Sequence, residues 1–205
     1  MRALAAPVRS RLGLPPQELF PLPSLDQLGP LRELVPKEQW REAATIVMLA
    51  GVAWAVTRDF RMWLAALSFI FGVWDLAYYG WLRVLLGWPA SVFDCDILFL
   101  LPVPWAAPVL APMMSATSLA WGGAVALLSP PQKVSTIAWL LLAGAGVAMT
   151  ATFGWDWRYW LAGGMPRSFP WAIFGTAELS GVLGFMLTRQ RSRSAPRWSA
   201  ANFSL

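Results

Sequence analysis

Four polar side chains lie inside long apolar segments, where an ionisable group is costly and usually functional. Asp75 lies near the middle of one segment, with Tyr79 four residues later and Arg83 eight residues later. Spacings of four place these three side chains on one face of a helix. Glu178 lies near the middle of a later apolar segment, with no cation nearby in the sequence. The four residues are therefore candidates for a polar site within the membrane, which would relay protons or bind a ligand.

A purely structural role explains the same residues. Asp75 would then accept a hydrogen bond from a tyrosine or tryptophan of a neighbouring helix, while Arg83 extends to the membrane surface. Glu178 would be protonated or hydrogen-bonded where two helices pack. An intramembrane enzyme that uses such carboxyls as acid and base is a further alternative, although no acidic motif of reliable spacing supports it.

Two more acids, Asp94 and Asp96, flank Cys95, the single cysteine. In an extended segment both carboxylates would point the same way and could hold a divalent cation, although two acids are a weak metal signal. They could instead pair with Arg83 or cap the segment that begins at Ile97. Cys95 has no histidine to activate it as a nucleophile, because the chain contains none.

The absence of histidine and the single cysteine limit the cofactors. This chain supplies no histidine ligand for haem, chlorophyll or zinc, and no cysteine cluster. We therefore expect no cofactor bound through His or Cys of this chain. A bound lipid, or a pigment shared with partner subunits, remains consistent with the sequence.

The apolar segments predict an all-α integral membrane protein. The chain of 205 residues is 57% hydrophobic and only 13% charged, whereas soluble domains carry about 25% charged residues. The third span is either broken by prolines or preceded by a re-entrant segment over 97–107. The five expected transmembrane helices cover 42–57, 62–86, 108–128, 134–153 and 171–188.

These spans divide the chain into three parts. Residues 1–41 form a polar, proline-rich extension with amphipathic character, 42–188 the polytopic helical domain, and 189–205 a basic tail. Lysines and arginines mark the cytoplasmic side of membrane proteins. We therefore expect a multi-pass protein of the cytoplasmic (inner) membrane, with a cytoplasmic C-terminus and, after five crossings, the N-terminus on the opposite side.

Two stretches are candidates for contact with partner subunits. Irregular backbone at membrane depth must be covered by protein or line a cavity, which applies to the proline-rich entry into the third span. The loop after the fourth span is rich in aromatic residues, and these suit either a partner contact or the membrane interface. The candidate contact residues are Pro102, Pro104, Trp105, Trp155, Asp156, Trp157, Arg158 and Trp160.

The function expected from these features is that of a non-catalytic accessory subunit of a larger membrane complex, with bioenergetic and photosynthetic complexes as examples. Its partners would be other integral membrane subunits and lipids, not nucleic acid. The alternative is a small ligand-binding membrane protein or transporter with its site around Asp75, Tyr79, Arg83 and Glu178.

Overall fold

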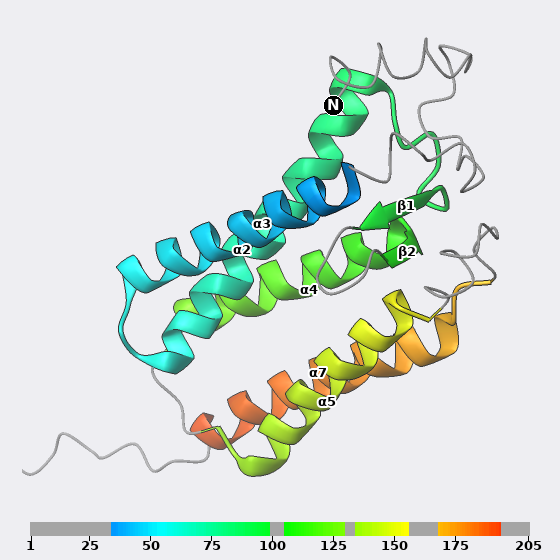
Figure 1. Ribbon diagram of the computed structural model, residues 1–205. Coiled ribbons are helices and arrows are strands. Elements are labelled where there is room, and N and C mark those ends of the chain that lie inside the picture. Colours follow the sequence, from blue (N-terminus) through cyan, green and yellow to red (C-terminus); the bar gives the residue numbers. More distant parts are fainter. Residues whose placement is uncertain (1–33, 99–104, 130–133, 156–167, 194–205) are drawn as a thin grey trace, which may run out of the picture.

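The computed structural model describes residues 34–98, 105–129, 134–155 and 168–193. Within these ranges the chain forms five helices and one β-hairpin (Figure 1). The hairpin lies between α3 and α4 in the sequence and consists of β1 (Cys95–Leu98) and β2 (Trp105–Pro108). The helices are α2 (Leu34–Val56), α3 (Phe60–Leu86), α4 (Leu110–Leu127), α5 (Thr136–Phe153) and α7 (Trp171–Arg193).

Four of the described helices are long and apolar enough to cross a membrane, namely α3, α4, α5 and α7 as far as Arg189. This result confirms the predicted multi-pass helical membrane protein. The helix that contains the predicted first span, α2, is not among the four, because its first turns are polar and include Arg41 and Glu42. A fifth crossing therefore stays a prediction.

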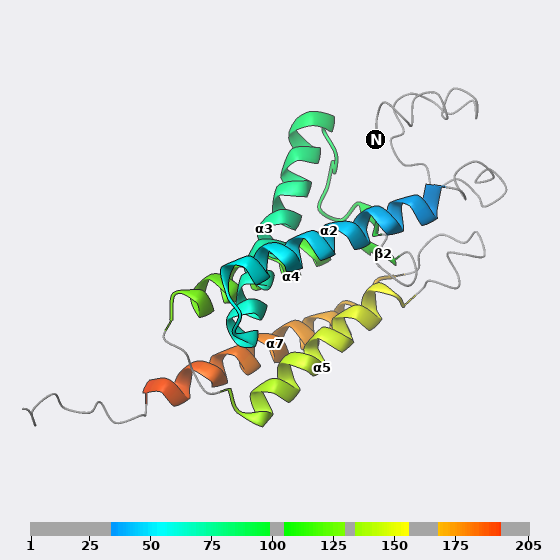
Figure 2. The ribbon, with the colours of Figure 1, turned by 60° about the vertical axis from the view of Figure 1, so that its left-hand side comes forward.

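The helices are arranged in two groups, which Figures 1 and 2 show from two sides. In one group α3 contacts both α2 and α4, and α5 and α7 form the other. The groups meet where α4 approaches α7, and there Trp121 packs edge-on against Phe185 with ring centroids 5.5 Å apart. In both views the C-terminal half of α3 rises away from the other helices.

Both ends of α3 have clear capping residues, Asp59 at the start and Gly87 at the end. At the start, the Asp59 carboxylate accepts hydrogen bonds from the backbone N–H groups of Arg61 (3.1 Å) and Met62 (3.0 Å), as an N-cap does. At the end, Gly87 has φ +67°, a left-handed conformation that glycine adopts without strain. The helix matches the predicted span at 62–86 to within two residues.

The entry into α4 differs from the prediction of a re-entrant or kinked segment. It is an antiparallel hairpin in which Cys95 lies opposite Pro108 and Leu98 opposite Trp105. The pairing continues past β2, since the N–H of Val109 donates to the Asp94 carbonyl at 2.9 Å. Backbone that is not helical is satisfied here by strand pairing, which a single segment of sequence does not reveal. Pro102 and Pro104 lie outside the described residues.

The chain's own helices cover this entry segment. Ala107 of β2 and Ala111 of α4 are buried in one cluster with Phe153 of α5 and Phe174 of α7. This is one of the two kinds of cover that irregular backbone near a membrane requires. For the described part of the segment, the hairpin is thus held between both groups of helices.

Helices α3 and α4 approach each other closely at two glycines. A Cβ atom on Gly72 of α3 would lie 2.4 Å from the carbonyl oxygen of Ala116. A Cβ atom on Gly123 of α4 would lie 2.6 Å from the carbonyl oxygen of Ala65. Small residues at such positions let two backbones touch inside a membrane, where dispersion contacts drive helix association.

Two helices extend past the predicted division of the chain. Helix α2 begins at Leu34, inside the predicted N-terminal extension, and its Pro36 is in the first turn, where proline is tolerated. Helix α7 continues to Arg193, inside the predicted basic tail, because no glycine or proline interrupts it there.

Candidate functional site: carboxyl groups around Asp75

Tyr79 of α3 is a buried polar residue, only 2% exposed. Its hydroxyl donates a hydrogen bond of 3.0 Å to the Asp96 carboxylate in β1. Both side chains are buried, and a buried hydroxyl or carboxyl is costly without a partner. The bond therefore fixes the hairpin to the C-terminal half of α3.

Asp75, one turn before Tyr79, is half-buried, and its carboxyl makes no hydrogen bond among the described residues. Asp96 of β1 and Glu42 of α2 lie close enough to Asp75 for their charges to act on it. Acidic groups on α2 and β1 therefore act electrostatically on the region around Asp75. Like charges in such a region favour binding of a proton or a cationic group.

Tyr78, Tyr79 and Arg41 also belong to this region. Tyr78 lies within electrostatic range of Asp75, Asp96 and Glu42, and also of Arg41, which has the opposite charge. Arg41 is 3.7 Å from Glu42 and forms an ion pair with it. The region between α2, α3 and β1 is thus polar and mostly acidic.

Arg83 continues the same helical face but binds elsewhere. Its guanidinium donates hydrogen bonds to the backbone carbonyls of Gly87 (2.9 Å) and Pro89 (2.7 Å). The two carbonyl groups lie just beyond Leu86, where α3 ends, so Arg83 ties the last turn of the helix to the chain that follows it. The structure therefore gives Arg83 a capping contact at the end of α3.

Glu178 lies in a different interface, where α7 meets α4. The residue is 8% exposed, and its Oε1 accepts a hydrogen bond from the Ser118 hydroxyl. Its Oε2 is buried with no hydrogen-bond partner in the described part of the chain. Neither α4 nor α5 contains a charged residue, and the recorded charges around Asp75 do not include Glu178.

Asp94 and Asp96 have separate partners. The Asp94 carboxylate accepts from the backbone N–H groups of Ala90 (2.8 Å) and Ser91 (3.0 Å), and so closes the turn before β1, whereas Asp96 binds Tyr79. Among the described residues, no group of three or more His, Cys, Asp or Glu side chains is placed to hold a metal ion.

The thiol of Cys95 has a raised pKa and is therefore mostly protonated at neutral pH. Partial desolvation by surrounding atoms, and then the negative charge of Asp96, raise its pKa to about 11. The thiolate is the reactive form of cysteine, so little of it is present near pH 7.

The structure describes part of the predicted partner surface. Trp155 follows α5 and is exposed, whereas the backbone of Trp105 pairs with Leu98 in the hairpin. The other predicted contact residues lie outside the described ranges, namely Pro102, Pro104, Asp156, Trp157, Arg158 and Trp160.

Sequence reasoning missed Glu42, Tyr78 and Ser118. Glu42 was placed at the edge of a span, and nothing in the sequence indicates that α2 brings it toward Asp75. A serine within a span is a signal for a buried hydrogen bond between helices, which could have singled out Ser118. A scan of protein-family models, a search of curated proteins and a search of solved structures each found no match to this chain.

Proposed function

We propose that the chain is a non-catalytic accessory subunit of a larger membrane protein complex and packs against partner subunits and lipids. This proposal rests on one observation, the exposure of apolar residues on the outer face of α2. Val47 on that face is 71% exposed, and Met48 beside it is also exposed. Gly51, one turn further on, has open space where a Cβ would be.

The length of α2 supports the same proposal. Its uncharged part, from Ala43 to Val56, contains about 14 residues and is roughly 21 Å long at 1.5 Å per residue. The hydrocarbon core of a bilayer is about 30 Å thick. A helix this short is poorly matched to lipid alone, and neighbouring helices reduce the cost of the mismatch.

The small residues of α2 suit a helical partner. Gly51 and Ala55 are four residues apart and both exposed, a spacing that lets another helix approach closely in a membrane. A glycine that faces lipid only would weaken the helix without a packing gain. We therefore place the partner on this face.

The described charged groups also support a structural role. Asp59 caps α3, Asp94 closes a turn and Arg83 binds backbone carbonyls. Arg189 donates to the Ser129 hydroxyl at 2.8 Å and so joins α7 to the end of α4. Each of these groups stabilises the fold of the chain itself, which is what a scaffold subunit requires.

Gly51→Leu tests the proposal. The native membranes would be extracted in mild detergent, and the tagged chain isolated with its partners for mass spectrometry. We expect stoichiometric partners with the natural chain and their loss with Gly51→Leu. The matched control is Gly80→Leu on α3, because Gly80 also has open space around it and should retain the partners.

Two results would contradict the proposal: recovery of the natural chain alone, or partners that survive Gly51→Leu. Equal loss with Gly80→Leu would also count against a contact through α2. Thermal melting of each variant separates lost association from lost folding, because neither leucine should meet another part of the chain.

The proposed location is the cytoplasmic membrane, with the C-terminus cytoplasmic. The turn between α2 and α3 lies at the same end of the helices as the C-terminal end of α7 (Figure 1). By the bounds of these elements, Arg58 and Arg61 belong to the turn and the start of α3, and Arg189 to the last part of α7. Clustered arginines favour the cytoplasmic side. With α2 as a fifth crossing, the N-terminus would be on the opposite side. A lipid, or a pigment shared with partners, is the ligand consistent with this role.

A second candidate function is ligand binding at the acidic region around Asp75. The specific observation in its favour is that the charges of Glu42 and Asp96, on two other elements, act on Asp75. A cationic ligand or a transported proton would suit this arrangement. Ligand-dependent melting that disappears in Asp75→Asn would support it, while an unchanged response in that variant would exclude it.

A further inference from the structure

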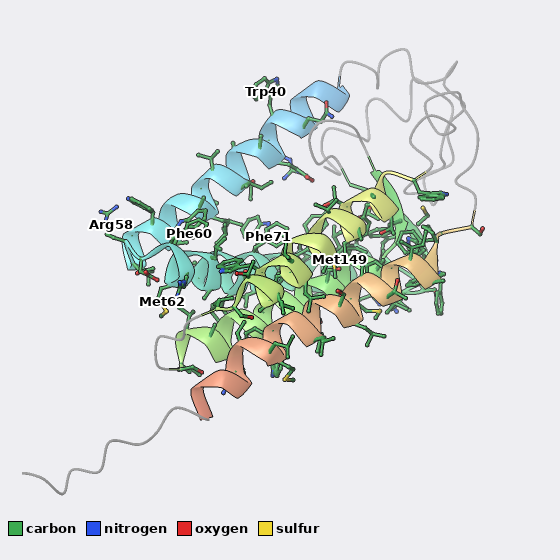
Figure 3. The ribbon with its side chains drawn as sticks, turned by 90° about the horizontal axis from the view of Figure 1, so that it is seen from below. Trp40, Arg58, Phe60, Met62, Phe71 and Met149 are labelled. Atoms are coloured by element: carbon green, nitrogen blue, oxygen red, sulfur yellow. The ribbon has the colours of Figure 1, made fainter. Side chains whose placement is uncertain are left out.

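The turn from α2 to α3 combines an exposed arginine, Arg58, with exposed aromatic rings. The guanidinium carbon of Arg58 lies 4.9 Å from the centroid of the Trp54 ring, within the range of a cation–π contact. Trp54 is 50% exposed and Arg58 is exposed too. Figure 3 shows Arg58 at the tip of this turn, at the opposite end of α2 from Trp40.

The charge of Arg58 is not neutralised by its neighbour. The Asp59 carboxylate is turned into the first turn of α3, where it accepts the N–H groups of Arg61 and Met62. Among the described residues, Arg58 makes no ion pair. The ring of Trp54 holds the guanidinium in place, while its N–H donors remain available to an anion.

Aromatic rings next to Arg58 mark the depth of this turn in the membrane. Phe60, which is 61% exposed, stacks on Trp63 of the same helix with centroids 5.9 Å apart. It also stacks on Trp139 of α5 with centroids 6.4 Å apart. Tryptophan rings collect at the level of the lipid headgroups, and Arg58 immediately precedes the apolar span that starts at Phe60.

We propose that Arg58, held by Trp54, binds the headgroup phosphate of an anionic phospholipid. Arginine donates paired, charge-assisted hydrogen bonds to phosphate oxygens. The acyl chains would lie along the exposed apolar side chains of α2, such as Val52 and Val56. This site does not depend on the proposed subunit role, because every group that forms it belongs to this chain.

The preference for anionic lipid can be measured directly. The full chain, with any partners that remain bound, would be placed in nanodiscs of equimolar phosphatidylglycerol and phosphatidylcholine. Native mass spectrometry then counts the lipids that stay bound after release from the disc. We expect phosphatidylglycerol to be enriched on the natural chain, and Arg58→Gln to reduce this enrichment about tenfold, the effect of one charge-assisted hydrogen bond.

The matched control is Arg41→Gln, which removes a charge near the other end of α2 and should leave the enrichment unchanged. Trp54→Leu should lower it in part, because the guanidinium loses its support. The proposed site would be wrong if phosphatidylglycerol enrichment were unchanged in Arg58→Gln, or if it fell equally in Arg41→Gln. If inorganic phosphate displaced the bound lipid completely, the site would have to be assigned to a free anion and not to a lipid.

Discussion

Adding one methyl group to Gly123 should separate α3 from α4, whereas adding it to Gly122 should not. In Gly123→Ala the new Cβ would lie 2.6 Å from both the Ala65 carbonyl oxygen and the Phe69 nitrogen. Both are backbone atoms, so no side-chain rotation relieves the overlap. In Gly122→Ala the new Cβ meets nothing within 4 Å.

The size of the effect follows from the overlap. Ordinary contact begins at 3.4 Å, so the helices must move apart by about 0.8 Å at this point. A gap of 0.5–1 Å forfeits roughly a quarter to a half of each dispersion contact along the interface. Overpacking of this kind costs about 1–3 kcal/mol. Gly122→Ala should instead stabilise the helix by up to about 1 kcal/mol, so the two variants should differ by about 3 kcal/mol.

The free energy of unfolding can be measured by titration with sodium dodecyl sulfate in mixed micelles. The pair shares one helix, one change in chemistry and neighbouring positions, so differences in micelle composition cancel. The reasoning would be refuted if Gly123→Ala were as stable as Gly122→Ala. Gly72→Ala and Gly80→Ala on α3 repeat the comparison, because only the Cβ at Gly72 would meet α4.

Three residues give further predictions. Tyr79→Phe should cost about 1–3 kcal/mol of unfolding free energy, because the buried Asp96 carboxyl loses the hydroxyl that it accepts from. Ser118→Ala should cost a similar amount, since Oε1 of the buried Glu178 would lose its donor and the carboxyl would then have no hydrogen-bond partner among the described residues. Alkylation of Cys95 by iodoacetamide should accelerate up to about pH 11, where its thiol titrates. Because the folded state keeps this proton longer than the unfolded chain, stability should fall as pH rises from about 9 to about 11.

Each of these outcomes has its own control. Tyr78→Phe removes a hydroxyl that makes no hydrogen bond within the described part of the chain, so a loss equal to that of Tyr79→Phe would contradict the role given to the Asp96 bond. Ser115→Ala removes only a weak 3.8 Å contact to the Met149 sulfur, and it should be nearly neutral. An alkylation rate for Cys95 that levels off near pH 9 would show that the thiol is not shielded by its surroundings.

The ends of the helices could be read from the sequence because their signals are local. Asp59 and Gly87 are cap residues on either side of one apolar run, and both act within a few residues along the chain. The predicted span at 134–153 likewise agrees with α5, which begins after the N-cap Ser135. Local chemistry thus sufficed to predict most of the helices.

The contacts between elements could not be read in this way. Tyr79 was predicted on a stripe with Asp75 and Arg83, but its hydrogen bond goes to Asp96, seventeen positions along the chain. The hairpin depends on two segments that pair only after the chain has turned back. The close approach at Gly72 and Gly123 depends on how two helices cross, and other glycines, such as Gly122, face open space. The helical repeat of the sequence alone does not distinguish glycines at a helix contact from glycines that face open space.

The hairpin has a mechanical consequence for the helices that it joins. Through β1 and β2 the chain fixes how far α4 can slide past α3 along the membrane normal, and the two backbones pack closely at Gly72 and at Gly123. Helices α3 and α4 should therefore move as one rigid body. The interface between α4 and α7 is different, because its polar contacts among the described residues are side-chain hydrogen bonds of Glu178 and Arg189. Any rearrangement of this protein within the bilayer should occur at that interface.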